Sequence, residues 1–132
     1  MLYGLDTSAL VRIITAEPPE LAAKVATRVS GIIAEGGACL VSDVVVAETY
    51  YALQYHYGFT KADAISDLRQ IAETFGFEFS PSAKAALSLP RADAASPGVV
   101  DRMLAGEYLS RDATTISCER DFRKLSRTEV IR

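Results

Sequence analysis

The chain of 132 residues has one histidine, no tryptophan and two cysteines. A single histidine, His56, excludes a ribonuclease that uses two histidines as general acid and general base, and we expect it to be an ordinary residue near a helix end. The sequence also lacks a Gly-x-Ser-x-Gly elbow, a phosphate-binding Gly-Lys-Ser/Thr loop and a Gly-x-Gly-x-x-Gly turn. If the protein is a hydrolase, metal-assisted catalysis is the chemistry that remains.

Long apolar runs are missing too. No stretch approaches the roughly 20 apolar residues of a membrane span, and no basic leader with a small-residue cleavage site is present, so no signal peptide is expected. Cys39 and Cys118 both lie in apolar, strand-like segments, which predicts two small buried thiols in a reducing compartment and no disulfide. We therefore expect a cytoplasmic protein with no membrane partner.

Composition predicts one globular domain over residues 1–132. Apolar residues make up 49% of the chain and charged residues 23%, enough to fill a core and cover it. The net charge of −3 does not indicate a nucleic-acid binder, but the tail after Asp121 has four basic residues (Arg123, Lys124, Arg127 and Arg132) against Glu129. That tail is either a solvated surface or a patch that contacts phosphates.

Apolar periodicity alternates between strand and helix, which is typical of an α/β fold with a parallel sheet covered on both faces. Strands are predicted at residues 1–5, 38–41, 75–79, 113–118 and 129–131. Helices are predicted from Thr7 or Ser8 to Ile14, from Pro18-Pro19 to Gly36, from Ser42 or Asp43 to Tyr57, from Thr60 through Ala72, at 82–87, from Ser96-Pro97 onward, and at 120–125. The expected architecture is three α/β/α layers around a mainly parallel five-stranded sheet.

Several carboxylates fall at matching places in this pattern. Asp6 closes the first strand, Glu48 lies in the first turns of an apolar helix, Asp101 follows a helix start, and Glu119 and Asp121 follow a strand. Functional groups collect at the carboxyl ends of parallel strands, where helix N-termini also point. Gathered there, these acids would repel one another unless Mg²⁺ or Mn²⁺, which prefer oxygen ligands, neutralised them. Such an ion supports phosphodiester hydrolysis.

Structural roles are the alternative for each acid. Asp6 could be a helix N-cap, Glu48 and Asp101 solvated helical residues, and Glu119 and Asp121 caps of the last helix. Four other acids (Asp43, Glu73, Glu107 and Asp112) are interpreted as structural. The tyrosines near Glu48 (Tyr50, Tyr51, Tyr55 and Tyr57) either pack against the sheet or form an aromatic surface for dimerisation or base stacking.

Four segments together resemble the PIN-domain ribonucleases, and among them the VapC-type toxins of toxin–antitoxin pairs. These segments are Leu5-Asp6-Thr7-Ser8-Ala9-Leu10, Val46-Ala47-Glu48-Thr49-Tyr50-Tyr51-Ala52-Leu53, Val100-Asp101, and the run from Ile116 to Leu125. The resemblance implies a parallel sheet between helices, an acidic pocket that binds Mg²⁺ or Mn²⁺, endonucleolytic cleavage of RNA, a homodimer and a cognate antitoxin. Asp6, Glu48 and Asp101 match the core acids, and Thr7 or Ser8, with Ser117, match hydroxyls that orient the pocket.

One segment departs from the family pattern. Where the family usually has Asp in a Thr-x-Asp-x-x-Phe context, this chain has Ser117-Cys118-Glu119-Arg120-Asp121-Phe122, so Glu119 or Asp121 supplies the fourth acid. Arg120, Arg123 and Lys124 are candidates for positioning RNA. The sequence thus favours a metal-dependent endoribonuclease that leaves 5′-phosphate and 3′-hydroxyl ends. A weak or inactive PIN-like module that binds RNA or protein is the main alternative; a phosphatase would want a lysine or a second Asp beside Asp6.

Overall fold

The computed structural model describes residues 1–88 and 98–132. Helices and strands alternate along the chain much as the periodicity predicts. The elements are β1 (Leu2–Gly4), α1 (Thr7–Thr15), α2 (Pro19–Ala34), β2 (Ala38–Val41), α3 (Asp43–Tyr57), α4 (Lys61–Ala72), β3 (Phe77–Phe79), α5 (Pro81–Leu87), α6 (Val99–Ser110), β4 (Thr115–Ser117), the 3₁₀ helix η1 (Arg120–Lys124) and β5 (Thr128–Val130). The predicted helix start at Ser96-Pro97 lies outside the described residues; α6 follows Gly98 as its N-cap.

Polar caps set the helix boundaries that the sequence indicates. Ser42 and Thr60 accept hydrogen bonds from the backbone N–H groups of Val45 and Asp63 at the starts of α3 and α4, which satisfies donors that have no partner inside the helix. At the end of α3, Gly58 takes a left-handed conformation with φ of 70°, which glycine adopts without a steric penalty. These starts and stops confirm the sequence-based predictions.

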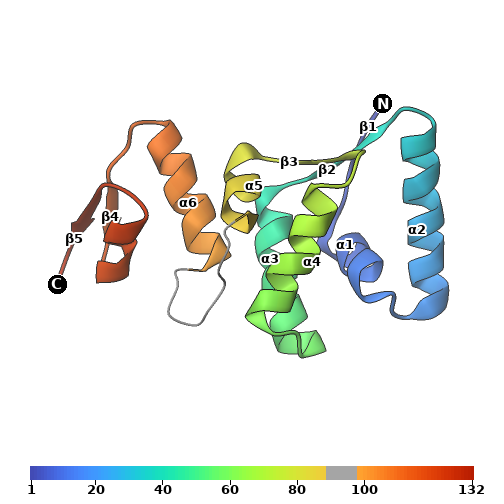
Figure 1. Cartoon of the computed structure of the whole chain (residues 1–132), viewed down its shortest axis with the longest axis horizontal. Coiled ribbons are helices and arrows are strands. Elements are labelled where there is room, and N and C mark those ends of the chain that lie inside the picture. Colours follow the sequence, from blue (N-terminus) through green and yellow to red (C-terminus); the bar gives the residue numbers. More distant parts are fainter. Residues whose placement is uncertain (89–97) are drawn as a thin grey trace.

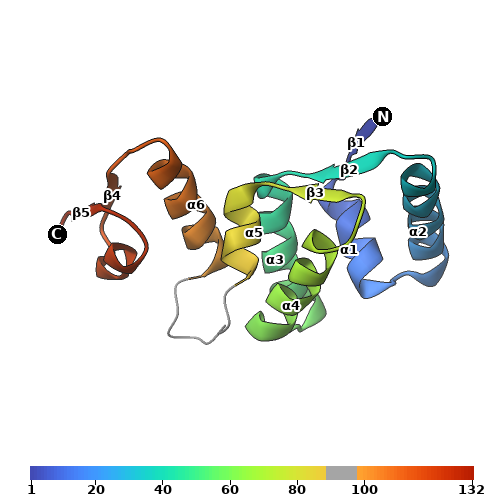
Figure 2. The ribbon, with the colours of Figure 1, turned by 45° about the horizontal axis from the view of Figure 1, so that its top comes forward.

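The strands form two parallel sheets. β1, β2 and β3 pair in that order, with Tyr3 opposite Cys39 and Cys39 opposite Phe77, while β4 pairs with β5. The α/β class with parallel strands is confirmed. The arrangement differs from the expected single five-stranded sheet, because α6 packs on α5 and the chain leaves α6 far from β1. Figures 1 and 2 show β4 and β5 at the end of the molecule opposite to β1.

Helices cover one face of the three-stranded sheet. Side chains on that face, including Leu5, Val41 and Phe79, pack into a core with α3, α4 and α5, while Tyr3 and Cys39 pack against α2. The next residues along the strands point to the other face, and there Leu2 and Leu40 are exposed. Figure 2 shows the helices gathered on one side of these strands. The described residues therefore form two layers at this sheet rather than the expected three.

Two local predictions need correction. The third strand begins at Phe77 rather than Phe75, because Gly76 has φ of +94° and Phe75 points into solvent, 85% exposed. Cys118 is exposed, contrary to the expectation of a buried thiol, because among the described strands β4 pairs only with β5 and leaves its other side open. Cys39 is buried as predicted, and both cysteines are free. Among the described residues, no helix combines the length and apolar character needed to cross a bilayer.

Candidate functional site

Asp6 and Glu48 come from elements far apart in the sequence and meet through one threonine. Asp6 follows β1 as the N-cap of α1, where its Oδ1 accepts a hydrogen bond from the backbone N–H of Thr7 at 2.7 Å. The Thr7 hydroxyl donates to Glu48 Oε1 on α3 at 3.3 Å, and the Ser8 hydroxyl donates to Asp6 Oδ2 at 3.3 Å. Both carboxylates are exposed, so they remain accessible to a ligand. The capping role that was the alternative for Asp6 is thus present alongside this pairing.

The positions of α1 and α3 follow from packing. α1 and α3 lie against each other beneath the carboxyl ends of β1 and β2, with Leu10 and Val46 completely buried between them. Burial of each such side chain stabilises the fold by about 1.5–3 kcal/mol. The N-terminal turns of both helices therefore face the same edge of the sheet, which is the arrangement that the sequence predicts for Asp6 and Glu48.

Asp101 lies on the other flank of α3. It is in the first turn of α6 and is half-buried. Its charge acts on Tyr50: burial raises the pKa of the Tyr50 phenol, and the negative charge of Asp101 raises it further. The influence of Asp101 on Tyr50 was not predictable from the sequence, because it depends on how α6 docks against α3.

The α3 tyrosines divide between core and surface. Tyr50 is buried, whereas Tyr51 is partly exposed and Tyr55 is 79% exposed. The rings of Tyr51 and Tyr55 stack with their centroids 6.2 Å apart and an interplanar angle of 26°. Tyr57 accepts a hydrogen bond from the Arg12 guanidinium at 3.3 Å. The packing alternative is confirmed for Tyr50, and the exposed Tyr51 and Tyr55 leave a role in dimerisation or base stacking as a prediction.

Glu119 and Asp121 lie in the C-terminal unit, by which we mean residues 115–132, and not beside Asp6. The Ser117 hydroxyl accepts a hydrogen bond from the backbone N–H of Glu119 at 3.0 Å, so Ser117 shapes the turn after β4 rather than the Asp6–Glu48 pair. Asp121 pairs with Lys124 at 3.5 Å, and both side chains are largely exposed. Two further predicted RNA contacts, Arg120 and Arg123, are also exposed on η1.

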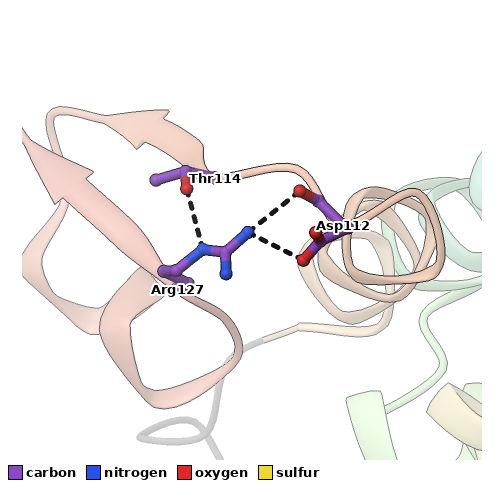
Figure 3. A network of polar contacts seen from close by, with 3 residues as sticks. All are labelled: Asp112, Thr114 and Arg127. Atoms are coloured by element: carbon purple, nitrogen blue, oxygen red, sulfur yellow. Dashed lines mark hydrogen bonds and ion pairs between the residues drawn. The ribbon is translucent and has the colours of Figure 1, made fainter.

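Arg127, from the basic tail, has a structural role that sequence reasoning missed. Its Nε donates to the Thr114 hydroxyl at 2.8 Å, and its Nη2 donates to the backbone oxygen and the Oδ1 of Asp112 at 2.9 and 3.1 Å (Figure 3). Asp112 has a left-handed backbone with φ of 54°, and this contact holds it at the turn between α6 and β4. Asp43, interpreted as structural, indeed accepts a hydrogen bond from Ser80, the N-cap of α5, at 2.6 Å.

The predicted cluster of four acids is not assembled within one chain. In residues 1–88 and 98–132, no group of three or more His, Cys, Asp or Glu side chains lies close enough to hold a metal ion. The structure links Asp6 to Glu48 through Thr7, places Asp101 in the first turn of α6, and leaves Glu119 and Asp121 at η1, which follows β4. Figure 1 shows β4 well apart from α1 and α3. The described acids of a single chain therefore do not form a complete divalent-cation site.

Comparisons with known proteins point to one family. The model of the PIN domain family matches residues 3–128. No curated protein matches the chain. Among solved structures, a chain of the crystal structure of VapBC2 from Rickettsia felis, bound to a DNA fragment from their promoter, is 17% identical with a TM-score of 0.44, and the match covers 98% of this chain and 98% of that one. A likeness this distant is no guide to function.

Proposed function

The chain belongs to the PIN domain family, and from that premise we propose that it is a divalent-metal-dependent endoribonuclease, the cytoplasmic toxin of a toxin–antitoxin pair. It would hydrolyse RNA phosphodiester bonds to leave 5′-phosphate and 3′-hydroxyl ends. Its partners would be an RNA substrate, a cognate antitoxin protein and a second copy of itself. The VapC-like segments around Asp6, Glu48 and Asp101 support this choice within the family.

The Asp6–Thr7–Glu48 contact is the observation that carries the proposal. A helix cap needs only Asp6, and a solvated helix needs nothing at Glu48. Yet Thr7 contacts both of these acids, which are 42 residues apart: its backbone N–H donates to Asp6 and its hydroxyl donates to Glu48. Acids that a fold gathers to hold an ion repel one another without it: two carboxylates would do so by about 1 kcal/mol in water and about 4 kcal/mol at an effective dielectric of 20 if they came to about 4 Å. Because such repulsion destabilises the fold, two acids held near each other favour a role in binding a cation.

Mg²⁺ or Mn²⁺ is the cofactor proposed for these acids, since neither Asp6 nor Glu48 has a histidine or thiol beside it that would favour zinc. When bound, such an ion polarises a phosphoryl oxygen and activates water. The candidate ligands are Asp6, Glu48, Asp101 and either Glu119 or Asp121. Thr7, Ser8 and Ser117 would orient backbone and carboxylates, as their hydrogen bonds do now.

Substitution of the paired acids tests the proposal. Asp6→Asn and Glu48→Gln should each abolish cleavage of a single-stranded RNA in Mn²⁺, while far-ultraviolet circular dichroism stays unchanged and the melting temperature stays level or rises because repulsion is relieved. Glu35→Gln, an exposed acid at the end of α2, is the matched control and should cut RNA like the unmodified protein. Equal cleavage in excess chelator, or full activity of Asp6→Asn, would contradict the mechanism.

A catalytically inactive PIN-like module is the second candidate. It is favoured by one observation, the lack of any group of three acids among the described residues. Titration calorimetry with Mn²⁺ separates the two: the nuclease should bind the ion and Asp6→Asn should not, whereas the inactive module should give no heat in either form while still binding RNA or the antitoxin.

A further inference from the structure

β1 has an open edge of known hydrogen-bonding pattern. On its β2 side, the Leu5 N–H donates to Leu40 O and the Met1 carbonyl accepts from Ala38 N. Since backbone groups of alternate residues point to opposite sides of a strand, the N–H and C=O groups of Leu2 and Gly4 point away from β2. Strand order ends at β1 on that side, and Leu2 is 65% exposed. An unpaired parallel edge of this kind is a template for another strand.

β4 has the matching open edge. On its β5 side, Thr115 N–H donates to Arg127 O and the Ser117 carbonyl accepts from Ile131 N. The N–H and C=O groups of Ile116 and Cys118 therefore point away from β5, and the Ile116 side chain is 71% exposed. A two-stranded sheet is marginal by itself, and parallel sheets are normally covered on both faces. Both edges thus have unpaired groups that a parallel partner would satisfy.

The two edges fit in one particular register. In a parallel pair of strands, a residue whose backbone N–H and C=O bond to the partner strand lies opposite a residue whose own N–H and C=O point away from the first strand. Tyr3 in β1 and Cys39 in β2 are such a pair. Gly4 would then lie opposite Ser117, and Asp6 opposite Glu119. No atom lies within 4 Å of a Cβ built on Gly4, so a side chain introduced at this position has room on the sheet face. A shift by two residues also satisfies the backbone, but this register aligns the ends of both strands.

The chain cannot bring its own β4 to its own β1 while α6 stays packed. Val99 and Met103 of α6 lie in the same core as Ala83 and Leu87 of α5, and Gly106 lies so close to α5 that an added Cβ would be 3.2 Å from Ser82 Oγ. Only residues 111–114 separate α6 from β4, a reach of at most about 14 Å. Figures 1 and 2 place α5 and α6 between β4 and β1. A second copy has no such restriction.

The distribution of charge and of exposed apolar side chains also favours a second copy of the chain as the partner. Residues 118–132 have five basic and three acidic residues, while residues 1–117 have nine basic and fourteen acidic residues, so the two parts have net charges of +2 and −5. α6 also leaves Leu104, Tyr108 and Leu109 exposed, and the uncovered sheet face leaves Leu2 and Leu40 exposed. The C-terminal unit of one copy would bring positive charge to the acidic part of another, and α6 would bring apolar side chains near its bare sheet face.

We propose that two copies of this chain exchange their C-terminal units, with β4 of each copy adding in parallel to the outer edge of β1 of the other. The joint sheet has the order β3-β2-β1-β4-β5, with the last two strands from the second copy. Because both copies give and receive the same strand, the assembly closes as a symmetric dimer. Each site then takes Glu119 from the second copy beside Asp6. This last point rests on the proposed function; the strand pairing does not.

Cysteine cross-linking tests the pairing without any need for activity. Gly4→Cys and Ser117→Cys are made in separate chains with tags of different mass, each with Cys118→Ser, and the chains are co-expressed and treated with a mild oxidant or a short thiol cross-linker. Adjacent strands about 4.8 Å apart are within disulfide reach, so a mixed two-chain product is expected. Glu129→Cys on β5 replaces Ser117→Cys as the control and should give little product.

Two other outcomes would overturn the exchange. A chain with both Gly4→Cys and Ser117→Cys that links only to itself would mean that β4 reaches β1 of the same chain. No product in either format, with a mass by sedimentation of 14.2 kDa rather than about twice that, would mean that the edges do not pair.

Complementation tests the shared site separately. Asp6→Asn and Glu119→Gln chains, each inactive alone, should recover activity when co-expressed, because a mixed exchanged dimer keeps one intact site. Random mixing predicts about one quarter of wild-type activity, since half of the dimers are mixed and one of their two sites is intact. If the chains cross-link but activity does not recover, the exchanged dimer is supported and the role of Glu119 is refuted. If activity recovers but the chains do not cross-link, the strand pairing is refuted.

Discussion

The N-terminal region of residues 1–88 and the C-terminal unit differ in what holds them together. The first encloses several wholly buried leucines, among them Leu10, Leu53 and Leu68. In the second, Thr115 and Phe122 are the buried residues. The unit is otherwise held by the β4–β5 ladder and by hydrogen bonds, including those of Arg127 to Asp112 and Thr114 just before it. Asp6 and Glu48 therefore stand on a well-packed scaffold, whereas Glu119 and Asp121 stand on a unit that needs a partner to be fixed in place.

The alkylation rates of the two cysteines compare the N-terminal region with the C-terminal unit directly, and we expect them to show the largest difference. Cys39 in β2 is fully buried and burial raises the pKa of its thiol, while Cys118 is exposed. In protein diluted until any exchanged dimer has dissociated, alkylation of Cys39 should be at least about a thousandfold slower than that of Cys118, since it requires opening of a core whose stability is of the order of 5 kcal/mol or more. Mass spectrometry of iodoacetamide-treated protein follows both rates. Similar rates would mean that the N-terminal region is as open as the C-terminal unit.

Leu53→Ala should destabilise the protein more than truncation of any exposed leucine. Leu53 is completely buried in the main core, and removal of a buried leucine costs about 2–5 kcal/mol, the transfer free energy plus that of the cavity. Urea denaturation followed by circular dichroism should show the loss as a lower midpoint. Leu21→Ala on the exposed side of α2 is the control, and a comparable loss there would contradict the assignment of the core.

Phe122→Ala should loosen only the C-terminal unit. Phe122 is the buried side chain of η1, and its burial stabilises the unit by about 1.5–3 kcal/mol. The amide of Thr115, which donates to Arg127 O, should exchange with solvent at least about tenfold faster. The urea midpoint for the N-terminal region should stay unchanged. A shift of that midpoint as large as that of Leu53→Ala would mean that the two regions unfold as one.

Local signals in the sequence were sufficient for the elements and for bringing Asp6 and Glu48 to the same edge of the sheet. Ser42, Thr60 and Gly58 fix helix boundaries through hydrogen bonds and backbone conformation within a few residues of themselves, so the pattern predicts them. The meeting of Asp6 with Glu48 was also predictable, because both follow from the rule that the ends of parallel strands and the starts of the next helices share an edge.

Long-range docking was beyond the same reasoning. Periodicity gives five strands but does not say which edges pair, and the packing of α6 on α5 separates β4 from β1. Cys118 illustrates the consequence: an apolar strand residue is buried only where something covers the strand, and β4 has an open side. The influence of Asp101 on Tyr50 likewise depends on how α6 meets α3.

Lys124→Ala should have the smallest effect on the stability of the C-terminal unit. This variant tests whether the exposed ion pair of Lys124 with Asp121 orders that unit. Lys124 Nζ lies 3.5 Å from Asp121 Oδ1, but the two side chains are 64% and 72% exposed, and exposed pairs of this kind contribute about 0–1 kcal/mol because water and salt screen them. The exchange rate of the Thr115 amide should therefore change less than about threefold, which corresponds to roughly 0.6 kcal/mol.

Arg127→Ala removes the same charge together with the bonds to Asp112 and Thr114, and it should speed the exchange of that amide more. If Lys124→Ala had the greater effect, the exposed ion pair rather than the turn after α6 would be what orders β4 and β5.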